Sequence, residues 1–196
     1  MLDKQILRNT ILYIIELAGE NGIGEVKLNK ALVMVDALHK KIYGESLTGA
    51  TYIKHKYGPV PGREAYALLK HLIETREIEV FEEMISPGIY EKNHYTESRA
   101  SRDLFTEEEQ ELISWAVSTV MGMSAQQLSA ISHDRYYRNT AMFREINLDD
   151  ICAFRISEDG ELSEDEADRL EKLMEDTADE ISQLIHSEKT TAHSAV

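Results

Sequence analysis

Apolar residues recur at intervals of three and four in two stretches near the start of the chain, the spacing that gathers them on one face of a helix. In residues 3–18 these positions are Leu7, Ile11, Ile14, Ile15 and Ala18. In the second stretch they are Leu28, Ala31, Leu32, Val35, Leu38 and Ile42, with the lysines largely on the other side. Because Gly19 and Gly44 end the two runs, the pattern predicts two amphipathic helices.

A mixed segment and a third helix are predicted next. Residues 51–57 combine β-branched and aromatic residues with lysines and end at Gly58-Pro59, which predicts a short strand or extended segment. The third helix is expected to start near Pro61, because proline is favoured in a first helical turn, and to run through Ile73.

A β-hairpin and three further helices complete the pattern. Residues 78–85 and 89–96 alternate in part and flank a Ser-Pro-Gly turn, which predicts the hairpin. In a capping box, a hydroxyl and a reciprocal side chain satisfy free amides at a helix start. Such boxes are formed by Thr106 with Glu109, Ser124 with Gln127, and Ser163 with Glu166. They predict helices at roughly 107–121 and 125–134 and from 163 to about 186.

These elements predict a mainly helical α+β fold, a compact helical domain with a small antiparallel hairpin or sheet and an appended acidic C-terminal helix. A chain of 196 residues can bury one ordinary core but is short for two full domains. We therefore expect one domain at residues 1–156, followed by the acidic helix and a frayed tail at residues 157–196. The narrow apolar seam of that helix fits docking on its own domain, a partner helix or self-association, so a homo-oligomer stays open.

The net charge of −15 is distributed unevenly. Residues 1–100 hold 13 basic and 14 acidic residues, whereas residues 101–196 hold 8 and 22. An acidic protein is repelled by nucleic-acid phosphates unless it presents a separate basic surface. Such a surface could form only in residues 27–63, where seven basic residues face two acidic ones. The basic residues are Lys27, Lys30, Lys40, Lys41, Lys54, Lys56 and Arg63.

The sequence lacks the features of exported, membrane and disulfide-bonded proteins. Cys152 is the single cysteine, which excludes an intrachain disulfide and a thiolate zinc cluster. No apolar run approaches the roughly 18 to 20 residues that span a bilayer, and the start of the chain lacks the order of a secretory signal. We expect a cytoplasmic protein without a membrane partner.

Motifs of known catalytic chemistry are also missing. The sequence contains no phosphate-binding loop, no dinucleotide fingerprint, no nucleophile elbow and no His-Glu-x-x-His zinc motif. The densest polar and aromatic cluster runs from His133 to Arg138, and a helix-end histidine with partly buried tyrosine rings explains it better than a metal or catalytic role. We expect no enzymatic activity, no cofactor, no metal and no catalytic residue.

Three motifs follow one another in the first third of the chain. They are Lys27-Leu28-Asn29-Lys30 before a helix, a turn at Gly44 to Leu47, and the segment Lys56-Tyr57-Gly58-Pro59-Val60-Pro61. With Leu128-Ser129 and His133 farther on, this order resembles the Panacea domain, a family of prokaryotic and phage antitoxins that includes the SocA-like proteolytic adaptors. The resemblance covers roughly residues 6–140. The chain departs from the family by having Val33-Met34-Val35 in place of an aromatic pair and no tryptophan before Lys56.

The resemblance implies an antitoxin of a cellular or prophage toxin–antitoxin system. Such a protein neutralises a cognate toxin by direct contact, and a SocA-like adaptor also presents the toxin to a protease. The residue types of the Tyr57 to Pro61 segment favour a rigid connector, because glycine opens a conformation closed to other residues and proline fixes its own φ. A rigid exposed segment loses little entropy on binding. The predicted partner-binding residues are Lys54, Lys56, Tyr57, Gly58, Pro59, Val60, His133 and Tyr136.

Two other functions remain as alternatives. A nucleic-acid-binding regulator would use the first three helices and the 78–96 hairpin as a winged-helix-like unit, with the lysines of residues 27–56 on phosphates. The local basic charge favours it, and the acidity of the whole chain opposes it. An enzyme would use the cluster from His133 to Arg138, but no substrate class follows from those residues.

Overall fold

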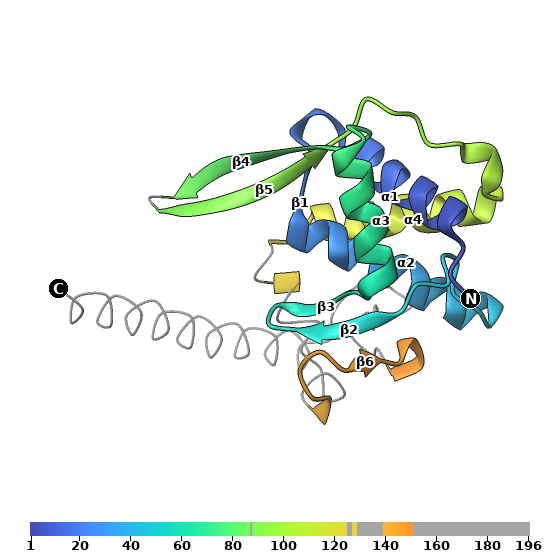
Figure 1. Ribbon diagram of the computed structural model, residues 1–196. Helices are drawn as coiled ribbons and strands as arrows, with labels where there is room; N and C mark the ends of the chain where they lie inside the picture. Colours follow the sequence, from blue (N-terminus) through green and yellow to red (C-terminus); the bar gives the residue numbers. More distant parts are fainter. Residues whose placement is uncertain (87, 125–126, 129–138, 151–196) are drawn as a thin grey trace. The chain divides into compact units, whose positions relative to one another are not determined.

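The structure is a computed structural model that describes residues 1–86, 88–124, 127–128 and 139–150 (Figure 1). All of these residues belong to one unit, residues 1–153. The predicted boundary at residue 156, the predicted acidic helix and most of the predicted helix at 125–134 lie outside the described residues.

The first predicted helix is α1 (Lys4–Ala18). Its N-cap is Asp3, whose carboxylate accepts hydrogen bonds from the N–H groups of Gln5 (2.9 Å) and Ile6 (3.0 Å). These bonds satisfy amides that a helix start leaves free. Its apolar stripe is buried except at Ala18, which is partly exposed, and a short 3₁₀ turn, η1 (Gly19–Asn21), follows. The periodicity of the sequence therefore located this helix correctly.

The second helix, α2 (Glu25–Tyr43), ends at Gly44 as predicted. Gly44 adopts φ 85°, a left-handed C-cap that glycine takes without strain. However, every residue from Lys30 to Asp36 is buried. The prediction that the lysines of this helix lie largely on an exposed side is wrong for Lys30, and Ile42 of the predicted apolar stripe is exposed.

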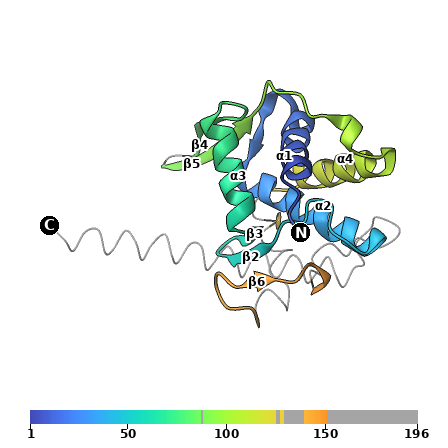
Figure 2. The same cartoon turned by 45° about the vertical axis from the view of Figure 1, so that its right-hand side comes forward.

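The reason is the position of α2 in the domain. It packs against α1, against α4 (Glu107–Met121) and against β3 (Gly58–Pro61), so its middle turns have neighbours on several sides (Figure 2). A helix surrounded in this way is buried around its circumference, and its sequence need not show a polar face.

One sheet contains the predicted hairpin, formed by β4 (Glu79–Ser86) and β5 (Ile89–Tyr95). The strand order is β1-β5-β4, where β1 (Ile23–Gly24) pairs antiparallel with β5 and leads directly into α2. The register changes between Met84 and Ser86, which marks an irregularity near the turn. The hairpin projects away from the helices (Figure 1).

The second sheet contains most of the segment that was predicted to be a rigid connector. The antiparallel order is β3-β2-β6, with β2 (Tyr52–His55) in the centre and β6 (Glu145–Ile146) on one edge. The segment predicted as a rigid turn is therefore mostly a strand, β3, and Pro61 lies in that strand instead of in a first helical turn. Two prolines are compatible with β3 because it is an edge strand, where a proline nitrogen can face away from the one neighbouring strand.

The remaining helices begin with recognisable caps. Helix α3 (Arg63–Glu74) starts after Gly62, and α4 starts at the predicted capping box, in which Thr106 and Glu109 bond reciprocally. The predicted box of Ser124 and Gln127 also forms, with bonds of 2.8 and 3.2 Å. Two short 3₁₀ turns, η2 (Arg102–Leu104) and η3 (Leu148–Asp150), lie between and after these elements.

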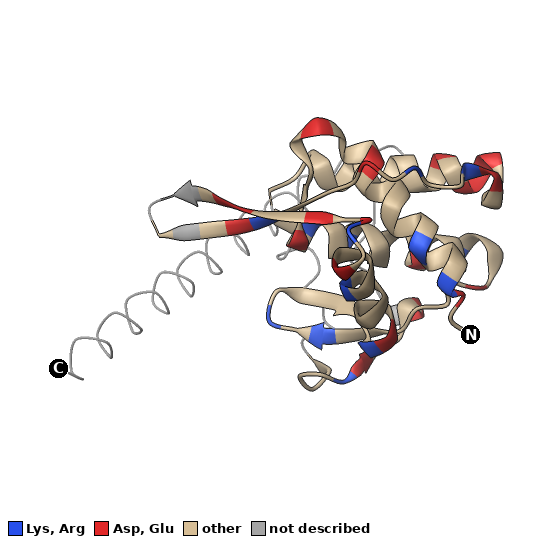
Figure 3. Ribbon diagram, turned by 45° about the horizontal axis from the view of Figure 1, so that its top comes forward, with Lys and Arg blue, Asp and Glu red and all other residues tan. Residues whose placement is uncertain are grey.

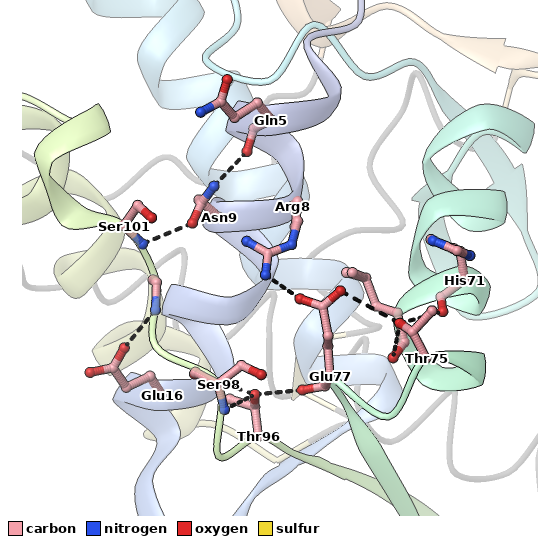
Figure 4. Close-up of polar contacts among 12 residues, drawn as sticks. Gln5, Arg8, Asn9, Glu16, His71, Thr75, Glu77, Thr96, Ser98 and Ser101 are labelled. Atoms are coloured by element: carbon pink, nitrogen blue, oxygen red, sulfur yellow. Dashed lines mark hydrogen bonds and ion pairs between the residues drawn. The ribbon is translucent and has the colours of Figure 1, made fainter.

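Polar contacts along α1 connect it to segments far away in the sequence (Figure 4). Arg8 forms an ion pair with Glu77 at the junction of α3 and β4. Asn9 accepts a hydrogen bond of 2.8 Å from the N–H of Ser101, after the β4–β5 hairpin. These contacts fix both ends of that hairpin to the helical core.

Candidate functional site

Two of the motifs that suggested a family resemblance meet in space. The start of α2 and the β2–β3 hairpin line one pocket of about 570 Å³, which we call the α2–hairpin pocket. Its walls are Glu25, Val26, Asn29 and Lys30 of α2, Ile53 and His55 of β2, Tyr57, Pro59, Val60 and Pro61 of the turn and β3, and Arg63 and Tyr66 of α3. A pocket of this volume is large enough for a small molecule or for side chains of a partner.

A buried polar network holds the β2–β3 hairpin against α2. The carboxylate of Asp36 accepts hydrogen bonds from the N–H of Thr48 (2.8 Å) and the hydroxyl of Tyr52 (2.7 Å), and all three residues are buried. Burial raises the pKa of Tyr52 well above its ordinary value, so its hydroxyl keeps the proton that it donates. Burial also raises the pKa of Asp36, although the hydrogen bonds from Thr48 and Tyr52 act in the opposite direction. The network fixes β2 and therefore the pocket wall.

The hairpin closes through Gly58, as its sequence suggested. Gly58 pairs with His55 and has φ 103°, a conformation that residues with a side chain rarely adopt. The two residues between them, Lys56 and Tyr57, form the turn, and the Lys56 ammonium lies 5.3 Å from the centre of the Tyr57 ring. Tyr57 lines the pocket, and 47% of the residue is still exposed.

Lys30 is the unusual residue of the pocket wall. It is only 1% exposed, and its Nζ has no hydrogen-bond partner among the residues that the structure describes. Burial lowers the pKa of its amine to about 7. Lysine is almost never fully buried without a partner, because both its charge and its hydrogen bonds to water are lost.

The charged residues around Lys30 are mostly basic. Arg63 and His55 contribute basic groups to the lining, and Glu25 contributes the one carboxylate. Arg63 and Glu25 form no salt bridge within the described part of the chain, and both are exposed. When Lys30 is protonated, the basic groups of the lining outnumber its one carboxylate.

Exposed apolar side chains lie beside this pocket. We call Tyr57, Tyr66, Met142 and Phe143 the apolar rim; Tyr66 is 56% exposed and Phe143 is 66% exposed. The Phe143 ring lies 6.0 Å from that of His55, and its N–H donates to the carbonyl of Lys54 (2.9 Å), which holds it beside β2. Phe143 also has φ 62°, a strained conformation for an aromatic residue. Strain that presents an aromatic ring to solvent is more typical of functional surfaces than of folding cores.

The predicted binding residues divide into three groups. Tyr57, Pro59 and Val60 line the pocket, and Gly58 and Lys56 belong to the same hairpin. Lys54 is half-buried, and its Nζ donates to the carbonyl of Thr140 (2.8 Å), so it anchors a neighbouring segment. His133 and Tyr136 lie outside the described residues.

The sequence patterns do not identify several residues of the pocket and of the apolar rim. Lys30 was assigned to an exposed basic face, while Tyr66 and Phe143 were given no role. The available signal for Lys30 was its place directly before the apolar run Ala31 to Val35. No local pattern identifies Phe143, because β6 reaches β2 from residues much later in the chain.

The described residues contain neither a cluster of potential metal ligands nor a helix suited to a membrane. No three His, Cys, Asp or Glu side chains gather there in a group that could hold a metal ion. Among the same residues, no helix has the length and apolarity needed to cross a bilayer.

Comparison with known protein families identifies a match over the middle of the chain. Residues 28–137 match the family model described as Antitoxin SocA-like, Panacea domain, which covers more than half of the chain. No curated protein matches the chain. The matched region contains both hairpins and most of α2, and therefore most of the pocket wall.

Proposed function

Because this chain belongs to the family of SocA-like antitoxins with a Panacea domain, we propose that it neutralises a partner toxin by binding it directly at the α2–hairpin pocket and the apolar rim. The observation that carries this proposal is the convergence of two family-like motifs on one pocket with exposed aromatic residues beside it. Aromatic residues are enriched at protein interfaces and among the residues that dominate binding energy.

The rigidity of the hairpin supports binding at this surface. Gly58, two prolines and the Asp36 network fix the wall before a partner arrives. A preorganised surface loses little conformational entropy on association, so more of the contact energy appears as affinity.

We propose that neutralisation is stoichiometric and not enzymatic. The test is a titration of toxin activity with increasing amounts of the purified chain. Direct binding predicts that inhibition ends at a fixed molar ratio and is reversed when the complex is dissociated. Complete inactivation at a small fraction of that ratio would instead indicate catalysis and would reject the proposal.

A paired substitution tests the location of the surface. Replacing Tyr57 and Tyr66 by serine should weaken toxin binding, because both residues border the pocket and are exposed. Replacing the exposed pair Met84 and Tyr90 of the β4–β5 hairpin by serine is the matched control and should leave affinity unchanged. Equal loss of affinity in the two variants would contradict this location.

A protease-adaptor role, which the resemblance implies, would need a second contact surface. The β4–β5 hairpin is the candidate, because it projects from the core and its cross-strand pair Met84 and Tyr90 is exposed (Figure 1). The serine variant of this pair should still inhibit the purified toxin but should slow its degradation in cells. If toxin half-life in cells is the same with the variant and with the unmodified chain, the adaptor proposal fails for this surface.

The topology favours one alternative, a nucleic-acid-binding regulator. Helices α1 to α3 and the β4–β5 hairpin, with strand order β1-β5-β4, have the order of a winged-helix-like unit. The charges oppose it. Lys30 is buried, Lys27 donates to the carbonyl of Met121 (3.3 Å), and Lys40 pairs with Asp149 (2.7 Å).

The hairpin that would serve as the wing is also acidic. It carries Glu79, Glu82, Glu83 and Glu91 against Lys92 (Figure 3). Repulsion from phosphates is therefore expected where a wing would contact the backbone. Tight, salt-sensitive binding of duplex DNA in a gel shift at low salt would favour the regulator over the antitoxin.

A further inference from the structure

We propose that the α2–hairpin pocket is a binding site for a carboxylate, supplied by an acidic side chain of the partner toxin, and that Lys30 is the cation that holds it. The source of the carboxylate rests on the proposed function. The chemistry of the pocket does not, because it follows from residues of this chain alone.

The amine of Lys30 lacks a hydrogen-bond partner in the described part of the chain. Its Nζ is the single buried side-chain nitrogen or oxygen without a hydrogen bond in the described part of the chain. Buried polar atoms nearly always have a partner, and an exception calls for an explanation such as a bound group. Lys30 belongs to the wall of a pocket, so a ligand that enters the pocket and displaces the side chains covering its Nζ can supply the missing acceptor.

The charged and apolar residues of the pocket lining indicate the sign and size of the ligand group. Arg63 and His55 share the lining with Lys30, and Glu25 is the opposing carboxylate, so an anion is favoured over a cation. The walls between them are largely apolar, formed by residues such as Ile53, Pro59 and Val60. An acidic side chain combines a short hydrocarbon stem with one charged end and matches both features.

The single buried cation of the pocket favours a carboxylate over a phosphate. Strong phosphate sites usually bring several fixed donors to one dianion. Here one cation is buried, while Arg63 and His55 are exposed. A monoanion that forms one charge-assisted bond to Lys30 fits this arrangement better.

Binding should be coupled to proton uptake. An amine with a pKa of about 7 is partly neutral in the empty pocket at neutral pH, and a neighbouring carboxylate favours its charged form. Affinity should therefore fall as the pH rises from 7 to 9. The other titratable or charged groups that face the pocket are Glu25 from α2, His55, Tyr57, and Arg63 and Tyr66 from α3. A His55→Asn variant separates the titration of that residue from the titration of Lys30.

The chemistry of the pocket is tested without any toxin. In full-length protein labelled with ¹³C at lysine Cε, the Lys30 resonance is identified by its absence from the Lys30→Met spectrum and is titrated with pH. Phenylacetate should raise the midpoint of that titration, while its uncharged analogue 2-phenylethanol should not. Lys70→Met removes an exposed lysine outside the pocket and should leave the response unchanged.

Three results would overturn the assignment of the pocket. The first is a Lys30 midpoint that phenylacetate does not move, the second is an equal shift with the alcohol, and the third is a larger shift with inorganic phosphate than with phenylacetate. The last result would mean that the pocket prefers phosphate.

The toxin experiment then separates this inference from the proposed function. Lys30→Met should weaken toxin binding by roughly 30-fold or more and abolish the proton uptake that calorimetry detects in buffers of different ionisation enthalpy. If the unmodified chain does not inhibit the toxin, the proposed function fails, and the phenylacetate titration still decides the pocket. If it inhibits the toxin and Lys30→Met does so with the same affinity and proton uptake, the proposed function stands and this inference is wrong.

Discussion

The two hairpins of this protein have the same secondary structure but different surroundings. The β2–β3 hairpin lies against α2, is joined to it by the buried Asp36 network, and lines the α2–hairpin pocket. The β4–β5 hairpin projects from the core, and its polar network is exposed: Glu83 accepts hydrogen bonds from Tyr95 (2.8 Å) and Asn93 (3.0 Å). The two carboxylate networks should therefore contribute differently to stability. When a carboxylate is removed, buried partners are left without an acceptor, whereas exposed partners bond to water instead.

The largest effect is expected from removing the buried carboxylate of Asp36, with the exposed carboxylate of Glu83 as its comparison. Asp36→Ala leaves buried groups of Thr48 and Tyr52 without an acceptor and should lower the free energy of unfolding by about 3 to 4 kcal/mol. Glu83→Ala exposes its partners to water, so the expected loss is below about 0.5 kcal/mol. Urea unfolding of both variants measures the difference. Equal losses would show that burial does not distinguish the two hairpins.

The next effect is a gain in the free energy of unfolding, expected when the buried amine of Lys30 is removed. In the folded state the Lys30 amine has a pKa of about 7, whereas an unfolded lysine has its ordinary value of about 10.4. Between these values the unfolded chain binds more protons, so the stability of the unmodified protein rises with pH across that window. Below pH 7 the destabilisation from burying the amine is fully present.

Lys30→Met should therefore raise the free energy of unfolding at pH 7 by on the order of 3 kcal/mol, and this gain should shrink toward pH 10. Urea unfolding at several pH values measures this gain, and the Lys70→Met control should show no gain that depends on pH. A Lys30→Met variant that is less stable at every pH would mean that the amine is satisfied in the folded protein.

A smaller effect tests the strained glycines of the two hairpins. Gly58 (φ 103°) and Gly88 (φ 79°) both have positive φ. Gly58→Val should lower stability by about 1 to 3 kcal/mol, because β3 is held between α2 and β2 and cannot relieve the strain by opening alone. Gly88→Val should lower it by less than half as much, since the end of a projecting hairpin can open locally. Thermal melts of the two variants measure these losses. An unchanged melting temperature for Gly58→Val would show that a side chain at this position causes no strain.

The smallest effect is expected on the association rate. Residues 157–188 hold 13 acidic and 2 basic residues. We propose that this segment attracts a toxin with a basic site, because complementary charge speeds encounter. Removing residues 157–196 should slow association at low salt and matter less at high salt, provided circular dichroism shows that the rest remains folded. The alternative is that the segment only keeps the protein soluble, and unchanged rates at both salt concentrations would favour it.

The sequence was most informative where structure is local. Periodicity and end signals located α1 and α2, the Thr106 capping box located α4, and a turn sequence located the β4–β5 hairpin. The positive φ of Gly58 also followed from residue type. In each case the stabilising contacts lie within a few residues.

The sequence failed where distant segments decide the outcome. Lys30 is buried because α1, α4 and β3 surround α2, and the apolar run that follows Lys30 does not by itself reveal those contacts. The prolines of β3 suggested a connector, since only pairing with β2 reveals an edge strand. The apolar rim depends on Phe143, which reaches His55 from the other end of the domain.

Radical footprinting of side chains in the free chain and in its toxin complex tests the central claim most directly, because it reports the solvent access of aromatic residues and methionines on both hairpins at once. Our account predicts that Tyr57, Tyr66 and Phe143 lose reactivity in the complex, while Phe81, Met84 and Tyr90 keep theirs. Protection of the β4–β5 residues with no change at Tyr57, Tyr66 and Phe143 would contradict it.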